Sequence, residues 1–159
     1  MGNYAKDTSV STELSRLEIE KTLIRYGATG FAYATEPGRA MIGFCLQGRQ
    51  VRFLLPLPDI NGDEFRYTPA RRNERSEKAQ YDAWEQACRQ RWRALLLVVK
   101  AKLEAIETGI ATFDGEFMAN IVLPGGGTVG DWMTPQIERA YLTGAVPAML
   151  PMLGEGERS

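Results

Sequence analysis

The segment that most constrains the fold is residues 70–108, which contain neither glycine nor proline. Apolar residues recur along it at alternating steps of three and four, and Gly109 follows it directly. This spacing predicts one long helix that ends at Gly109 and turns a narrow stripe toward the core. The core stripe consists of Tyr81, Trp84, Cys88, Trp92, Leu95, Val99, Leu103 and Ile106.

Two further stripes follow from placing residues about 100° apart around the helix axis. The alanine stripe is either a half-exposed face of good helix formers or a tight helix–helix contact, which includes one between two subunits. It consists of Ala83, Ala87, Ala94, Ala101 and Ala105. The basic stripe is either a solvated face or a set of phosphate contacts. It consists of Arg89, Arg93 and Lys100, with Asp82 and Glu104 at its ends.

Positive charge is concentrated in this part of the chain. Residues 66–102 hold ten basic and four acidic side chains, whereas the whole chain has a net charge of −1. The arginines 71, 72 and 75 gather before the helix, where the helix dipole disfavours cations. A counter-anion or an acidic partner is therefore expected there, and the protein's own acidic surface can fill that role.

The predicted site combines cations that grip phosphates with aromatic rings that stack on bases. The cations are Arg49, Arg52, Arg66, Arg71, Arg72, Arg75, Arg89, Arg93 and Lys100. The stacking residues are Phe31, Tyr33 and Tyr67. Together they predict a binding surface for nucleic acid or another phosphate-bearing ligand.

Catalytic motifs are weak in this sequence. There is no histidine, so the usual general base and the commonest metal ligand are missing. Cys45 and Cys88 stand alone within apolar patterns and are expected to be buried thiols. Residues 125–130 match G-x-G-x-x-G without a βαβ context, so a plain loop is expected. We predict a non-enzyme without a metal or cofactor, and we interpret the paired carboxylates as turn and cap residues.

The remaining chain predicts short elements. Ser15 and Glu18 have the spacing of a capping box for a helix that ends near Tyr26. Alternating apolar residues and turn signals predict three antiparallel strands. The expected strands are 31–35, 40–47 and 50–55, with a brief edge strand at 65–67. The following segment is open between a helix over residues 114–120 and a strand over 117–123. A further helix is expected over 134–142, capped by Thr134.

These elements predict an α+β fold: an N-terminal helix, a three-stranded antiparallel meander, one long central helix packed on the sheet, and short C-terminal helices. Residues 11–153 are expected to form a single domain, which ends in an apolar segment over 145–153, and disordered tails are expected at 1–10 and 154–159. The sequence has no apolar run of membrane-spanning length and no secretory signal, which predicts a cytoplasmic protein.

Four segments resemble a family of small uncharacterised accessory proteins carried by bacteriophages and prophages. They are residues 25–28, 48–58, 68–72 and 84–95. The resemblance covers most of residues 10–153. It implies the cytoplasm of a bacterial host and a role such as genome handling or countering host defence, and it carries over no catalytic residue.

The leading hypothesis is a phage accessory protein that binds nucleic acid, most simply single-stranded, through the basic segment before the helix and the basic stripe. The alternative is an interaction protein or an oligomeric anti-defence inhibitor that binds a host protein or an anionic nucleotide. It would use the alanine stripe for self-association as a homo-oligomer. A metal-dependent nuclease is a third hypothesis, and it requires a cluster of carboxylates.

Overall fold

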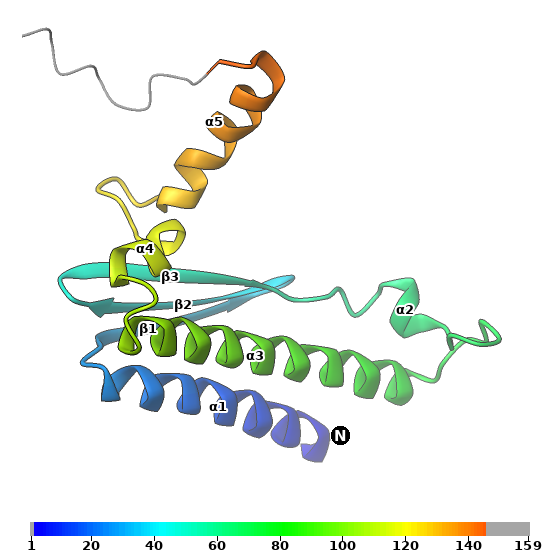
Figure 1. Cartoon of the computed structure of the whole chain (residues 1–159). Helices are drawn as coiled ribbons and strands as arrows, with labels where there is room; N and C mark the ends of the chain where they lie inside the picture. Colours follow the sequence, from blue (N-terminus) through cyan, green and yellow to red (C-terminus); the bar gives the residue numbers. More distant parts are fainter. Residues whose placement is uncertain (1, 146–159) are drawn as a thin grey trace, which may run out of the picture.

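A computed structural model describes residues 2–145 of the chain, with side chains from residue 12 onward. The structure is a mixed α+β fold, as the sequence predicts (Figure 1). Its elements are α1 Gly2–Arg25, β1 Thr29–Glu36, β2 Arg39–Leu46, β3 Arg49–Pro56, α2 Asp63–Arg66, α3 Glu77–Glu107, α4 Phe113–Phe117, the 3-10 helix η1 Met118–Asn120, and α5 Val129–Thr143. Apart from residue 145, the expected apolar segment and C-terminal tail lie outside the described residues.

The three strands form an antiparallel sheet in the order β1-β2-β3, so the predicted meander is confirmed. The β2–β3 hairpin turns at Gln47 and Gly48, whose φ angles are 48° and 71°. Two consecutive positive φ angles are typical of the type I′ turn, whose twist suits a two-residue hairpin. From Ala40 to Leu46 of β2 the side chains alternate between buried and half-buried, which fixes one face of the sheet toward the core.

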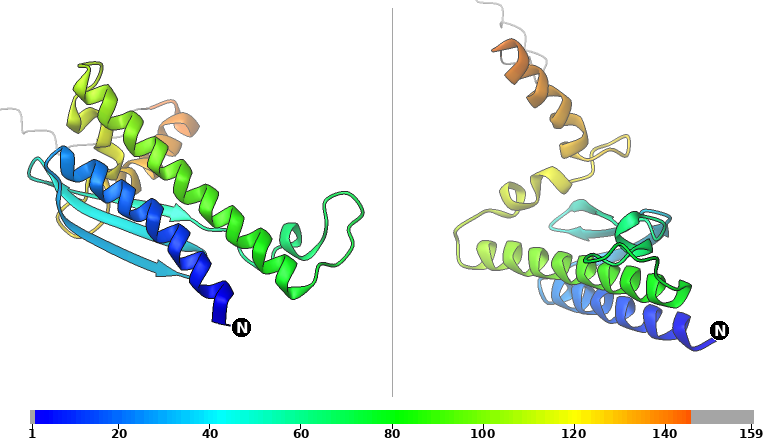
Figure 2. Two further views of the ribbon diagram at one scale, coloured as in Figure 1. Left: turned by 90° about the horizontal axis from the view of Figure 1, so that it is seen from below. Right: turned by 90° about the vertical axis from the view of Figure 1, so that its right-hand side faces the viewer.

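Helices α1 and α3 lie side by side on one face of the sheet (Figures 1 and 2). Between the two layers, Ile19 and Leu23 of α1 meet Val99 of α3 and the inner side chains of β2 and β3. Phe117 closes one end of this core and is fully buried. The other face of the sheet carries neither α1 nor α3.

The long helix has the predicted extent. Ser76 is the N-cap and accepts a hydrogen bond from the Ala79 amide, and the helix ends just before Gly109, whose φ is 79°. Most of the core stripe is buried, including Trp92 and Val99. Tyr81, Trp84 and Ile106 of the same stripe are only half-buried.

Two predictions near the N-terminus and before α3 are wrong. Helix α1 covers residue 2 onward, including residues that we expected to form a tail, so Ser15 and Glu18 lie inside the helix instead of capping it. Residues 63–66 form one helical turn, α2, where a strand was expected at 65–67. Tyr67 alone makes a bridge to Glu74. The buried Phe65 explains the difference, because a helical turn lets this ring reach the core while its neighbours stay in solvent.

The C-terminal segment uses different caps from those expected. Thr112, not Asp114, caps α4. The expected helix and the expected strand each hold in part. The helices α4 and η1 run through Asn120, and Ile121 then makes a single bridge to Val51. Helix α5 is capped by Thr128, six residues before the expected cap, Thr134. The reason is a capping box at its start, described next.

Thr128 and Asp131 form that capping box, with reciprocal bonds of 3.1 Å from each backbone amide to the other side chain. The Thr128 amide and hydroxyl, with Arg52 adding a smaller effect, hold the pKa of Asp131 below its ordinary value. A lowered pKa stabilises the folded helix above the ordinary value, about 3.9, and that contribution is lost as the pH falls through the folded value. We therefore expect the first turn of α5 to fray below about pH 4, measured by amide chemical shifts.

The Asp131→Asn variant should show the frayed first turn already at neutral pH and little further change on acidification. Glu138→Gln, a neutralised carboxylate later in α5, is the matched control and should titrate like the wild type. An unchanged acid response in Asp131→Asn would contradict this account of the cap.

Candidate functional site

The structure distributes the nine predicted cations over separate places instead of one groove. Arg49, at the start of β3, lies 3.4 Å from Asp114. Arg52, three residues further along β3, lies 3.8 Å from Asp131 at the base of α5. Both arginines pair with carboxylates of α4 and α5, elements that lie away from the segment that precedes α3 (Figure 1).

Two of the three cations of the basic stripe of α3 are also paired within the chain. Lys100 Nζ donates a 2.8 Å hydrogen bond to Glu18 on α1. That bond is the main reason why the pKa of Glu18 is lowered, and Arg93 adds to the effect. Arg89 lies 3.0 Å from Glu85, whose side chain is buried. These pairs engage Lys100 with α1 and Arg89 with its own helix, whereas Arg93 is exposed and makes no ion pair with the described residues.

Residues 66–75, called the basic loop below, are ordered by their own backbone. The Thr68 amide donates to the Asn73 carbonyl at 2.8 Å, and the Asn73 amide donates to the Thr68 hydroxyl at 3.1 Å. Arg75 donates from its amide to Arg66 at 2.7 Å and from Nη1 to the Glu64 carbonyl at 3.1 Å. Arg75 therefore anchors the loop to α2, and its guanidinium is engaged by backbone carbonyls.

Two of the other three arginines of the loop lie against one aromatic ring, and the third follows in sequence. The guanidinium carbons of Arg66 and Arg72 lie 5.8 and 5.9 Å from the centre of the Tyr67 ring. The side chains of Arg72 and Asp63 are each 75% exposed and lie 3.9 Å apart, so this ion pair is long and weak. Arg71 is exposed and forms no ion pair with the described residues. We call Arg66, Tyr67, Arg71 and Arg72 the Tyr67 cluster.

The other two predicted stacking residues lie elsewhere. The ring of Phe31 packs 6.2 Å from Phe44, against the core. Tyr33 donates a 3.0 Å hydrogen bond from its hydroxyl to Glu20 on α1. Burial, followed by this bond, raises the pKa of Tyr33. Neither ring is next to the basic loop, so Tyr67 is the predicted stacking residue that the structure brings together with cations.

The alanine stripe lies on the side of α3 that is turned away from α1 and the sheet, by helix geometry. Ala94 and Ala101 are exposed, and the other three alanines are half-buried. Leu97 and Val98 extend the same surface and are 60% and 45% exposed. Self-association through this stripe stays a prediction.

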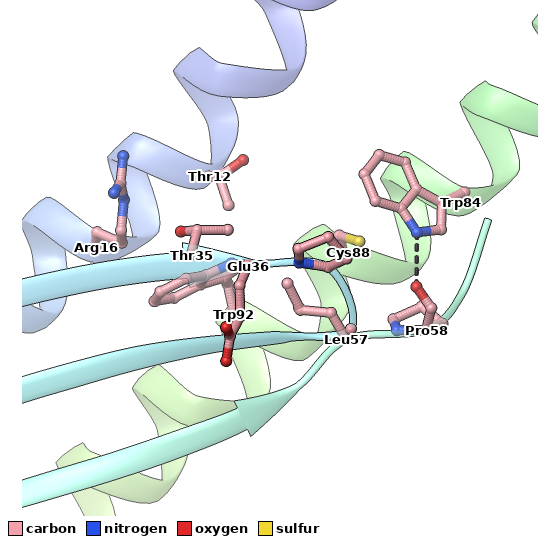
Figure 3. A pocket seen from close by; sticks show the side chains of 11 residues that line it. Thr12, Arg16, Thr35, Glu36, Leu57, Pro58, Trp84, Cys88 and Trp92 are labelled. Atoms are coloured by element: carbon pink, nitrogen blue, oxygen red, sulfur yellow. Dashed lines mark hydrogen bonds between the residues drawn. The ribbon is translucent and has the colours of Figure 1, made fainter.

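A cavity of about 550 Å³ opens between α1, α3 and the β1–β2 turn (Figure 3). Trp84, Cys88 and Trp92 of α3 form one wall, and Arg16 of α1 stands on the opposite wall. Trp84 Nε1 donates to the Pro58 carbonyl at 2.8 Å, so its polar atom is satisfied. The cavity thus offers aromatic surface with a cation at its edge.

Arg16 is the residue that the sequence analysis missed. Its guanidinium carbon lies 5.6 Å from the Tyr33 ring and 6.0 Å from the Trp92 ring, and its ion pair with Glu13 is long, at 3.9 Å. A signal was present in the sequence, because Arg16 continues the buried positions of α1 toward the N-terminus, where an apolar residue would fill the space.

Cys88 lies in the same cavity, yet its thiol is poorly suited to nucleophilic chemistry. Burial raises the pKa of Cys88, and the charge of Glu85 adds to the effect. The thiolate is the reactive form, so a raised pKa keeps the group protonated at neutral pH. Within residues 12–145, no three cysteine, aspartate or glutamate side chains gather in a way that would hold a metal ion.

No family model matches the chain, and no curated protein or solved structure matches it. None of the described helices is long and apolar enough to cross a membrane.

Proposed function

We propose that this protein binds single-stranded nucleic acid, without catalysis, through the Tyr67 cluster. The observation that carries the proposal is the meeting of Arg66 and Arg72 with the half-buried Tyr67 on an ordered loop, beside the exposed Arg71. Guanidinium groups bind phosphates, and a tyrosine ring stacks on any base, which an unpaired strand leaves accessible.

The neighbouring contacts favour this place over the other predicted cations. Arg49, Arg89 and Lys100 each lie within 3.4 Å of a carboxylate of the same chain. A ligand there would have to displace an existing partner. In the Tyr67 cluster the ion pair that the described residues make, from Arg72 to Asp63, is longer and largely exposed, so a phosphate can replace it at small cost. The hydrogen-bonded loop also reduces the entropy lost on binding.

The test is fluorescence anisotropy with a labelled oligothymidylate. Replacing the three arginines of the Tyr67 cluster with glutamine should weaken binding at least about tenfold at low salt, because three phosphate contacts are lost. The slope of log K against log salt should fall by about two, since each contact to a single strand contributes about 0.7. Binding should be level between about pH 6 and 9, because the chain has no histidine to titrate there.

The matched control removes the same charge elsewhere, by glutamine at Arg49, Arg91 and Arg139. It should bind within about twofold of the wild type, since these side chains lie outside the loop. An equal loss in both variants would show that only net charge matters. Folded wild-type protein that does not bind, or binds without salt dependence, would refute the proposal.

The resemblance to bacteriophage and prophage proteins supports placing this activity in phage genome handling within the cytoplasm of a bacterial host. Countering host defence belongs to the same proposal. The single-stranded preference would be tested by adding unlabelled duplex as a competitor, which should compete poorly.

A second candidate function, binding of a small anionic nucleotide, is favoured by the cavity beside Arg16. Its volume is typical of small-molecule sites, and its indoles can enclose a base while Arg16 holds a phosphate. Titration with adenosine monophosphate, followed by tryptophan fluorescence, tests this. We expect saturable quenching that Arg16→Gln weakens and that adenosine reproduces poorly; equal quenching by both ligands would exclude a role for Arg16.

A further inference from the structure

A cavity of about 340 Å³ opens beside Tyr67, at the end of the molecule where α2 and the basic loop stand clear of the sheet (Figure 1). Its lining consists of Asp63 and Glu64 from α2 and of Tyr67, Thr68, Pro69 and Arg72 from the basic loop. Sites for small molecules occupy roughly 300–1,000 Å³, so this cavity has room for one base but not for a large ligand. Through Tyr67 and Arg72 it is continuous with the Tyr67 cluster.

The two carboxylates of this cavity are unexpected in a site that binds only phosphate. An ionised carboxylate repels phosphate, and it accepts hydrogen bonds without donating any. Among the described residues, the Glu64 side chain has no hydrogen-bond or ion-pair partner and Asp63 has only its long pair with Arg72. Helix α2 is a single turn of four residues, so its dipole stabilises these charges little. Both carboxylates are therefore free to accept hydrogen bonds from a ligand.

The nucleic-acid bases differ in what they present to a carboxylate. Guanine has two adjacent donors, N1–H and the N2 amino group, which match the two oxygens of one carboxylate. Adenine and cytosine place a ring-nitrogen acceptor beside their amino group, and thymine and uracil flank a single N–H with two carbonyls. An acceptor that faces a carboxylate oxygen is repelled, so guanine is the base that these side chains favour.

The other groups of the cavity suit guanine as well. The Thr68 hydroxyl accepts a 3.1 Å bond from the Asn73 amide, and its own hydrogen, which has no acceptor among the described residues, can be donated to the O6 carbonyl. The half-buried Tyr67 ring offers a surface for stacking. A guanine nucleotide also replaces both members of the Arg72–Asp63 pair, because its phosphate binds Arg72 and its base binds Asp63. Neither charge then stays without a partner.

We propose that this cavity receives one guanine base of the bound strand, and that Asp63 and Glu64 make the Tyr67 cluster selective for guanine over thymine. This assignment rests on the proposed function, because the phosphate contacts of the cluster bring the strand to the cavity. The cluster supplies affinity for any sequence, and the two carboxylates supply the preference for one base. They also disfavour a strand without guanine, since they then lie unbonded beside its phosphates.

A comparison of four ligands tests the proposal without any variant. They are short oligothymidylates that carry one central guanosine, inosine or adenosine, or no substitution, measured by fluorescence anisotropy at one salt concentration. The guanosine strand should bind at least about fivefold more tightly than plain oligothymidylate, the low end for a bidentate base contact. Inosine lacks only the N2 amino group and should lose most of this gain. Adenosine, a purine of similar ring size, measures stacking alone and should gain less than about twofold.

A protein variant tests the two carboxylates directly. Asp63→Asn combined with Glu64→Gln should bring the affinities for the guanosine and thymidine strands within about twofold of each other. It should bind plain oligothymidylate at least as tightly as the wild type, because two negative charges beside the phosphates are gone. Glu74→Gln is the matched control, since Glu74 is an exposed carboxylate of the same loop outside the cavity lining. It should keep the preference for guanine, and circular dichroism confirms that each variant is folded.

The outcomes separate this proposal from the proposed function. Salt-dependent binding with equal affinity for all four strands would overturn the guanine site and leave the binding of single strands standing. Folded wild-type protein that binds none of the strands would refute both. Equal affinities for guanosine and inosine, or a guanine preference that survives in the Asp63→Asn, Glu64→Gln variant, would overturn the role of the carboxylates.

Discussion

Phe117→Ala is expected to lower the free energy of unfolding by about 3–5 kcal/mol. Phe117 is fully buried although it belongs to a helix of only five residues. Its ring makes edge contacts with Phe44 and Phe53 at 6.3 and 6.1 Å and lies 5.1 Å from Phe113. Alanine would leave a cavity among these rings and remove three aromatic contacts. The measurement is chemical denaturation with tryptophan fluorescence.

The matched control is Met118→Ala, one residue later in the chain. Met118 is 52% exposed, so its truncation should cost less than about 0.5 kcal/mol. Lys102 also packs over Phe117. Its Nζ lies 5.7 Å from the centre of the ring and donates to the Glu116 carbonyl at 2.9 Å. If both variants lost equal stability, α4 would not close the core as described.

The elements with a strong local signal were predictable from the sequence. Uninterrupted periodicity gave α3, and alternation between turn signals gave the meander. The start of α5 was predicted at the wrong residue because the sequence holds two patterns typical of a helix start. One is Thr134-Pro135, and the other is Thr128 with Asp131. The structure selects the earlier cap, since Thr128 is buried and both capping bonds are made. Local sequence alone does not show which of two caps is buried.

The candidate site was harder to predict, because charge counts ignore partners from distant parts of the chain. Lys100 and Glu18 are 82 positions apart, and Arg49 and Asp114 are 65 apart. Only the tertiary fold shows that these cations are paired. The Arg71-Arg72 segment was recognisable because its partners are local, within α2 and the loop itself. Arg75 was predicted to bind phosphate, but its guanidinium donates to a backbone carbonyl of α2, a helix that the sequence did not predict.

Arg89→Ala is expected to cost about 2–3 kcal/mol of stability, although the sequence analysis placed Arg89 among the phosphate-binding residues. The Glu85 side chain is only 8% exposed, and Arg89 Nη1 is its hydrogen-bond partner at 3.0 Å. Without Arg89, a mostly buried carboxylate would lose its counter-charge. Lys100→Ala removes a pair whose side chains are 42% and 54% exposed, so it should cost less than about 1 kcal/mol.

A double variant separates loss of the counter-charge from loss of packing. Adding Glu85→Gln to Arg89→Ala should recover part of the stability, because a neutral amide needs no cation beside it. Urea denaturation of the single and double variants gives both values. The assignment of Arg89 to the fold requires that its replacement weakens stability far more than oligonucleotide affinity. Equal costs for Arg89→Ala and Lys100→Ala, or a loss of affinity without a loss of stability, would return Arg89 to the surface that binds nucleic acid.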